Sequence, residues 1–325
     1  MTTKISVCIP TYNSQRFIRR CLESVLTQSY ADFEIIVSDN GSTDSTWDIL
    51  QSYHDPRLSL FRVDENRGLV YNFNRVMDLA RGEYVKILCS DDFLGPSILE
   101  LQSKFLDEHR EVVLVTCDRH VIDETGRPDR ILHWFPKVVF LRAIDFKILT
   151  LLYSNIIGEP SAVLIRRSAI QTAGPFKEGW STVVDLDMWL RLSRIGMIGC
   201  IPVPLCTIRC HPSSMSSEFH SAGVVADSVW RLAKAMLSGL EVGPLVKRIF
   251  WGKVAGSYVR HAISALRVGR LQSSLASWKR GFQIDPGFLG LLAYYLLFRP
   301  GVLGMRADSN EKIRICVGSA LHCVS

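Results

Sequence analysis

The sequence predicts an α/β fold, with a mostly parallel sheet flanked by helices and a helical region at its C-terminal end. Three observations predict it. Short apolar runs alternate with segments of helical periodicity through the first hundred residues. Clusters of turn and helix-capping residues follow those runs directly. From about residue 221 the pattern changes to helices without strands, which predicts two domains, 1–220 and 221–325.

Four apolar runs in the first ninety residues predict buried strands, at 5–9, 33–37, 58–63 and 84–89. Apolar residues recur at helical spacing between residues 17 and 26, and a second helix is expected from about residue 65 to Ala80. Strand, helix and strand in this rhythm indicate parallel βαβ units with right-handed crossovers.

The later elements are less regular. We expect a helix after Ser97, a strand at 112–117, an irregular segment from 118 to about 160, a strand at 161–165, a helix at 184–192 and a polar loop at 207–216. In the C-terminal region a pair of helices, 254–268 and 271–283, meets at Gly269 and Arg270. One such pair is too little for a solenoid, so we interpret it as a helical tail.

Composition narrows the classes of function. With 325 residues and 47% hydrophobic content, the chain can bury one large core or a core plus a smaller domain. Nine cysteines without paired CxxC spacing argue against a disulfide scaffold and for a reducing compartment. We find no secretory signal and no run of the ~20 apolar residues that a membrane span needs, so a cytoplasmic protein is expected. A net charge of +6 without a nucleic-acid motif predicts no nucleic-acid partner.

Two adjacent carboxylates, Asp91 and Asp92, end the fourth apolar run. The carboxyl end of a core strand is where open α/β sheets bind their ligands. Carboxylate oxygens clustered there suit Mg²⁺ or Mn²⁺ that is also held by phosphates. A plainer alternative is that the two residues cap the following helix, as Asp often does. The motif alone leaves both interpretations open.

Several motifs in order resemble the landmarks of the family-two glycosyltransferases. They are residues 9–13 (IPTYN), 34–44 (EIIVSDNGSTD), 66–68 (NRG), 81–84 (RGEY), 90–92 (SDD), 185–191 (DLDMWLR) and 209–211 (RCH). Each is weak alone, but the set covers roughly residues 4 to 216. The resemblance implies a GT-A fold, a nucleotide-sugar donor, a divalent metal and inversion at the anomeric carbon.

By this resemblance, Asp92 and Asp91 hold the metal or reach the ribose and donor sugar, and a neutral His211 adds a metal ligand. Asp185 matches the family's general base, although Asp185 can also simply cap its helix. The chain departs from the family's usual acids at Cys89 and Val184.

The nucleotide is expected at the first strand ends. Tyr12 can lie against the base, Pro10 and Thr11 can present backbone groups, and Asp39 can accept a hydrogen bond from the base or ribose. The alternative is that Tyr12 is an ordinary half-buried aromatic residue and Asp39 a turn residue. The remaining donor-site residues expected from the resemblance are Asn13, Asn66, Ser90, Asp91 and Arg209, with Arg209 on the phosphates.

By this resemblance, we expect transfer of a sugar from a UDP-sugar, or from a dTDP- or GDP-sugar, to a glycan or lipid-linked acceptor. This fits synthesis of a cell-surface polysaccharide or glycolipid. The alternatives are a non-catalytic nucleotide-sugar-binding or scaffold protein and a nucleotidyltransferase, although residues 10–13 lack the glycine-rich loop that the latter needs. An apolar patch at 289–298 is interpreted either as a peripheral membrane contact or as a surface packed on the first domain or across a homo-oligomer.

Overall fold

The computed structural model describes residues 3–153, 155–180, 183–212, 214, 224–237, 243–267, 269–286 and 290. The chain divides into two compact units. The first comprises Met1–Phe146, Asn155–Glu178 and Val184–His211, and the second Lys147–Ser154, Gly179–Val183 and Pro212–Ser325.

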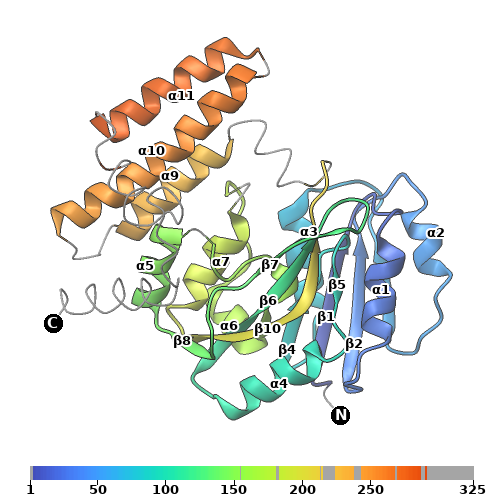
Figure 1. Cartoon of the computed structure of the whole chain (residues 1–325). Helices are drawn as coiled ribbons and strands as arrows, with labels where there is room; N and C mark the ends of the chain where they lie inside the picture. Colours follow the sequence, from blue (N-terminus) through green and yellow to red (C-terminus); the bar gives the residue numbers. More distant parts are fainter. Residues whose placement is uncertain are drawn as a thin grey trace. The chain divides into compact units, whose positions relative to one another are not determined.

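A ten-stranded sheet is the centre of the first unit (Figure 1). Four parallel strands begin it in the order β3-β2-β1-β4: β1 (Ile5–Thr11), β2 (Phe33–Asp39), β3 (Leu58–Arg62) and β4 (Tyr84–Ile87). These are the four strands that the apolar runs predict. The α/β prediction with a mostly parallel sheet is therefore confirmed.

The other half of the sheet mixes directions. β9 (Leu164–Arg166) lies between β4 and β6 (Val112–Ile122) and is antiparallel to both. β6 runs parallel to β10 (Met197–Arg209), which pairs in turn with β5 (Phe93–Leu94). Two edge strands complete the sheet, β7 (Pro128–Leu132) on β6 and β8 (Val139–Leu141) on β10.

The expectation of irregular structure was wrong for two segments. The segment from 118 to 160 holds the end of β6, both edge strands and helix α5 (Ala143–Tyr153). The expected loop at 207–216 begins as the last three residues of β10. In both places polar residues sit within strands because their partners come from distant segments. Arg119, for example, is buried in β6 and pairs with Glu159.

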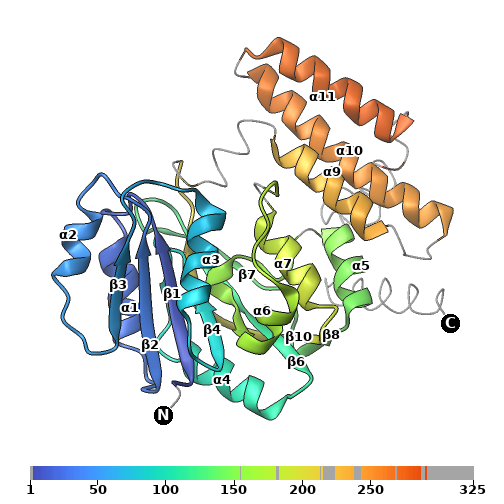
Figure 2. The same cartoon turned by 180° about the vertical axis from the view of Figure 1, so that it is seen from behind.

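Helices cover both faces of the parallel strands (Figures 1 and 2). α1 (Ile18–Leu26) packs on the face to which Ile5, Val7 and Ile9 of β1 contribute. α3 (Leu69–Leu79) packs on the other, where the Cys8 thiol donates to the Val76 carbonyl at 3.3 Å. All seven residues of β1 are buried, as expected of a strand that is covered on both sides.

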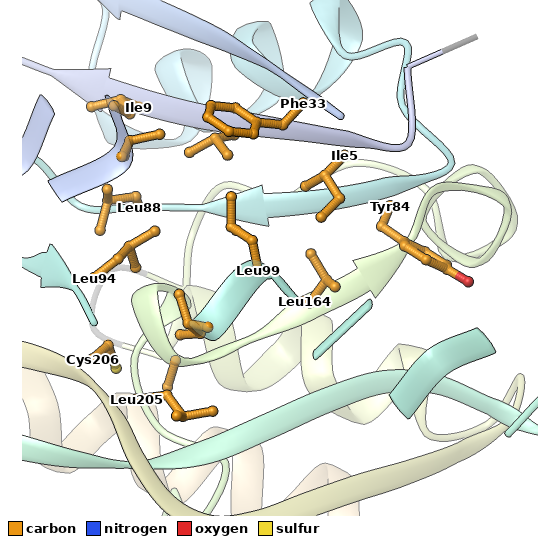
Figure 3. Packing of buried hydrophobic residues seen from close by; sticks show 14 of the residues in the cluster. Ile5, Ile9, Phe33, Tyr84, Leu88, Leu94, Leu99, Leu164, Leu205 and Cys206 are labelled. Atoms are coloured by element: carbon orange, nitrogen blue, oxygen red, sulfur yellow. The ribbon is translucent and has the colours of Figure 1, made fainter. Parts of the chain in front are cut away.

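The remaining helices of this unit are short. They are α2 (Thr46–Gln51), α4 (Ile98–Glu108), the 3₁₀ turn η1 (Pro160–Ala162), α6 (Arg167–Ala173) and α7 (Val184–Leu192). Leu99 of α4 lies among apolar residues from β1, β9 and β10 in the core (Figure 3). Leu88, directly after β4, belongs to the same core. Its burial fixes the backbone three residues before Asp91.

The second unit is mainly helical where it is described, and it includes the part of α5 from Lys147 onward. It holds α9 (Val224–Leu237), α10 (Pro244–Arg267) and α11 (Leu271–Ile284), and α10 lies between the other two (Figures 1 and 2). None of the described helices is long and apolar enough to cross a membrane. The apolar patch expected at 289–298 lies outside the described residues except for Gly290.

Candidate functional site

The acidic pair lies in two different environments. The Asp92 carboxylate is buried and accepts hydrogen bonds from Ser161 Oγ at 2.6 Å and from the backbone N–H of Arg209 at 2.9 Å. The Asp91 side chain is 27% exposed, and its Oδ2 lies 3.1 Å from His211 Nε2. Helix α4 begins only at Ile98, with Ser97 at its N-cap, so neither carboxylate caps it. The helix-cap interpretation was wrong.

Burial and the negative charge of Asp91 raise the pKa of Asp92 well above its usual range. A cation beside the two carboxylates would lower that pKa again, because it favours their charged forms. Ligand atoms of Cys89, Asp91 and Asp92 lie within 4.8 Å of one another, close enough for one ion. Burial also raises the pKa of the Cys89 thiol, so this sulfur is neutral and ill suited to a hard cation.

Arg209 and His211 approach the acidic pair from the end of β10. Arg209 Nε donates to the Asp91 carbonyl at 3.3 Å, and its guanidinium lies 4.8 Å from the ring centre of Phe17. The His211 ring lies 4.9 Å from the same Phe17 ring. The structure therefore places both residues beside Asp91 and Asp92, and their contacts with a metal and with phosphate stay predictions. In this arrangement the Arg209 guanidinium also donates to the carbonyls of Asp123 and Glu124.

The carboxyl ends of β1 and β2 form the neighbouring part of the same sheet edge. Asp39 is buried, and Ser42 donates to it through its hydroxyl and, at 3.3 Å, its backbone N–H. Arg62, opposite it in β3, places its Nε 3.2 Å from Asp39 Oδ2. Tyr12 is 42% exposed just beyond β1. Arg62 was not identified from the sequence. The available signal was a basic residue at the end of β3, the strand that follows β2 in the chain.

Side-chain hydrogen bonds join the loops after β1, β2 and β4. Asn13 adopts a positive φ of 47°, and its Oδ1 accepts from the Thr43 N–H at 2.9 Å. Ser14 Oγ and Ser90 Oγ lie 2.7 Å apart. The predicted donor-site residues on these loops are thus held in one connected network.

Three further predicted residues have structural partners. Pro10 is buried within β1, and the Thr11 carbonyl accepts from the Asn40 N–H at 2.9 Å. Asn66 is exposed, and its Oδ1 accepts from Asn40 Nδ2 at 2.8 Å and from the Gly68 N–H at 2.9 Å. Asn66 therefore orders the turn that leads into α3, and its contact with a donor stays a prediction.

Asp185 lies in the first turn of α7. Its Oδ1 accepts from the Leu186 N–H at 2.7 Å and its Oδ2 from Asn155 Nδ2 at 3.0 Å. Burial, with the negative charge of Glu159, raises the pKa of Asp185 to about 7. Asp187 is engaged elsewhere, since it accepts from Arg191 Nε at 2.9 Å. A carboxylate with this pKa can take up a proton near neutral pH.

A segment that sequence reasoning had treated as irregular links Asp185 to the acidic pair. Asn155 holds Asp185 and bonds twice to Gly158, through Oδ1 to its N–H at 3.0 Å and through Nδ2 to its carbonyl at 3.2 Å. Ser161, three residues on, holds Asp92. Residues 155–161 therefore position both candidate carboxylates. No sequence signal marked Asn155, because its role depends on a contact thirty residues away.

Gly158 is the tightest point of this segment. Its φ is +93°, and a Cβ added there would lie 2.3 Å from the Arg119 guanidinium carbon. We expect Gly158→Ala to reduce the free energy of unfolding by about 2 to 4 kcal/mol, measured by denaturant titration. The matched control is Gly174→Ala, at φ +77° with no atom within 4 Å, which incurs only the backbone cost. Equal losses in the two variants would contradict the clash.

Comparisons with known proteins identify the family of this chain. The model of the family "Glycosyl transferase family 2" matches residues 6–174. Chondroitin synthase of Escherichia coli is 35% identical over 197 residues, which cover 59% of this chain and 27% of that protein.

Two solved structures share the fold. Staphylococcus aureus TarS 1-349 in complex with UDP-GlcNAc superposes with a TM-score of 0.68 at 20% identity, covering 98% of this chain and 92% of the other. The mannosyltransferase PcManGT of Pyrobaculum calidifontis in complex with GDP-Man and Mn²⁺ gives a TM-score of 0.54 at 19% identity, covering 99% and 88%. The chain belongs to glycosyl transferase family 2 and is a glycosyltransferase with a GT-A-like fold.

Proposed function

We propose that this glycosyltransferase moves a sugar, with inversion and with the help of a divalent metal, from a nucleotide-sugar to a hydroxyl of a glycan or lipid-linked acceptor. The observation that carries the proposal is the shared segment 155–161. It holds a carboxyl with a pKa of about 7 at one end and the buried member of an acidic pair at the other. A base and a site for a metal-bound diphosphate are the two parts that direct displacement at a sugar carbon needs.

The residues at the end of β4 fit Mn²⁺ or Mg²⁺. Asp91, Asp92 and His211 offer carboxylate oxygens and an imidazole nitrogen, donors that such cations accept. The ion would neutralise the charge that grows on the diphosphate as the bond from the sugar to its oxygen breaks. Asp92 is held by two hydrogen bonds before any ion arrives, so its oxygens are already oriented.

The chain's own residues supply the other steps. Asp39 can accept a hydrogen bond from the base or ribose, and the exposed ring of Tyr12 can lie against the base. Arg209 can pair with a phosphate once its guanidinium leaves the two loop carbonyls. Asp185 takes the proton of the acceptor hydroxyl while that oxygen attacks, and a single attack from the opposite face inverts the anomeric carbon.

We propose UDP as the donor nucleotide, acting in cell-surface polysaccharide or glycolipid synthesis on the cytoplasmic side of the membrane. A UDP-sugar is the ligand named for TarS, and polymer synthesis is the activity named for the chondroitin synthase. GDP-Man is the ligand named for PcManGT, so GDP-sugars belong in any test.

The test is release of nucleoside diphosphate from UDP-, dTDP- and GDP-sugars by the purified chain, with Mn²⁺ or Mg²⁺ and with EDTA. We expect slow hydrolysis of one donor class, lost in EDTA and restored by added metal. Calorimetric donor binding without turnover in any condition, even with a panel of glycan and lipid-linked acceptors, would instead indicate a non-catalytic binding protein. Absence of any metal-dependent binding would overturn the proposed donor class and metal.

A further inference from the structure

Helix α11 exposes large apolar side chains in one line. Leu271, Leu275, Trp278 and Phe282 are 62, 69, 40 and 55% exposed. Their spacing of four, three and four residues places them on one narrow side of the helix. We call these four residues the apolar stripe. An exposed line of Leu, Trp and Phe on a surface helix is typical of an interaction site.

The stripe is not the face with which α11 packs on α10. That face is made of small residues, Ser274, Ser277 and Gly281, which are buried. Ser274 Oγ donates to the Ala262 carbonyl of α10 at 2.8 Å, and Ser277 Oγ lies 2.7 Å from His261 Nδ1. In both cartoon views α11 lies on the side of α10 away from α9 (Figures 1 and 2). Packing on α10 therefore accounts for the small residues, while the large ones keep 40 to 69% of their surface exposed.

The charged residues of α10 and α11 are all basic. Between residues 244 and 284 there is no Asp or Glu, whereas eight Lys or Arg occur: Lys247, Arg248, Lys253, Arg260, Arg267, Arg270, Lys279 and Arg280. Two of the eight do not contribute to a positive surface. Lys253 donates to the Thr150 carbonyl at 3.1 Å, and burial lowers its pKa to about 7. Arg248 Nε lies 4.0 Å from Asp285 Oδ1. Lys279 follows Trp278 directly, and Arg267 and Arg270 flank the turn that leads into Leu271. Basic residues therefore border the stripe along the helix and at its N-terminal end.

We propose that α10 and α11 form a docking surface for an anionic lipid bilayer, with the apolar stripe inserted among the acyl chains and the basic side chains on the headgroups. Leu, Trp and Phe beside Lys and Arg on one helix is the composition that interfacial helices use. A second copy of the chain is a poorer occupant, because two surfaces of the same strong positive charge repel each other. The inference does not rest on the proposed transfer reaction.

Co-sedimentation with vesicles tests the proposal on the intact protein, without donor or metal. Phosphatidylcholine vesicles are compared with vesicles that also contain phosphatidylglycerol, at low and high salt. We expect binding to the anionic vesicles, weakened by salt because screening shortens the reach of the basic residues. A Leu275→Ser and Phe282→Ser double variant should bind roughly tenfold more weakly or worse. The matched control is Ile131→Ser, which removes a side chain of 55% exposure from β7 in the other unit and should bind as the wild type does.

Lys279→Gln with Arg267→Gln should weaken binding to anionic vesicles and reduce its salt dependence. Unchanged circular dichroism of the variants shows that the fold is kept, as expected for exposed positions. Absence of binding of the intact chain to anionic vesicles at low salt overturns the proposal. So does a stripe variant that still binds vesicles but changes the mass of the protein in solution, since the stripe would then join copies of the chain. Neither result affects the transfer reaction, which is measured separately with soluble acceptors.

Discussion

Asp185→Asn is expected to lower the turnover number for sugar transfer by roughly 10²- to 10⁴-fold while donor binding is retained. The substitution keeps the size of the side chain and removes the carboxylate that we propose takes the proton from the acceptor. Among the hydrogen bonds of the described residues, none joins Asp185 to the proposed donor site at the ends of β1, β2 and β4. Turnover is measured with donor and acceptor, and donor affinity by calorimetry on the same preparation.

Asp187→Asn is the matched control, two residues along the same helix. It weakens the 2.9 Å bond to Arg191, so a modest loss of stability is expected without loss of turnover. Asp185→Asn itself should be no less stable than the wild type above pH 7, because it removes a charge that burial disfavours. If the two variants have equal turnover, Asp185 is not the base.

The pH dependence of turnover is a second test of the proposed role of Asp185. The active form of a base is the carboxylate, and the pKa of Asp185 is about 7. Turnover should therefore rise as the pH increases towards 7 and level off above it. Asn155 donates to the carboxylate and so lowers this pKa, which means that Asn155→Ala should move the midpoint of the rise to higher pH. A rise that stays at the same midpoint in Asn155→Ala would assign it to another group.

The four parallel strands were predictable because helices cover both their faces. A strand of that kind is a continuous apolar run, as 5–9 and 33–37 are, and the run is visible without any knowledge of partners. The edge strand β7 has no such run, since residues 128–131 are exposed and two of them are charged. The end of β6 was missed for a related reason. Asp118 and Arg119 are buried there, and their partners His133 and Glu159 come from other segments.

In the candidate site, too, some residues could be predicted from local sequence pattern and others could not. Asp91, Asp92 and Asp185 stand at a strand end or a helix start, positions that local pattern identifies. Asn155, Gly158 and Ser161 do not, because each matters through one contact far along the chain. Arg62 lies between these cases: its register opposite Asp39 follows from the parallel pairing of β2 and β3, once that pairing is known. Local sequence pattern thus finds the candidate reactive carboxylates and misses Asn155 and Gly158, whose roles depend on contacts far along the chain.

Asp92→Ala is expected to abolish metal-dependent donor binding and to lower kcat/KM by roughly 10³-fold or more. The carboxylate is the buried member of the pair, and Ser161 and Arg209 fix both of its oxygens. Its loss would remove a proposed charged ligand of the metal, and the nearby Cys89 thiol cannot replace it, because burial raises the pKa of that thiol and keeps it neutral. The measurements are a Mn²⁺ titration of UDP binding by calorimetry and kcat/KM at saturating metal.

Ser161→Ala tests the hydrogen bond that orients Asp92 separately from the Asp92 carboxylate itself. It removes the 2.6 Å hydrogen bond but leaves the carboxylate, so a smaller loss of about 10- to 100-fold in metal affinity is expected. His211→Ala should also cost less than Asp92→Ala, because a neutral imidazole contributes no charge to the site. The expected order of losses, with Asp92→Ala the largest, follows from electrostatics. Burial disfavours the charged form of Asp92, so a bound cation stabilises that carboxylate most. An Asp92→Ala protein that is folded and keeps Mn²⁺-dependent turnover would show that the cation is held elsewhere.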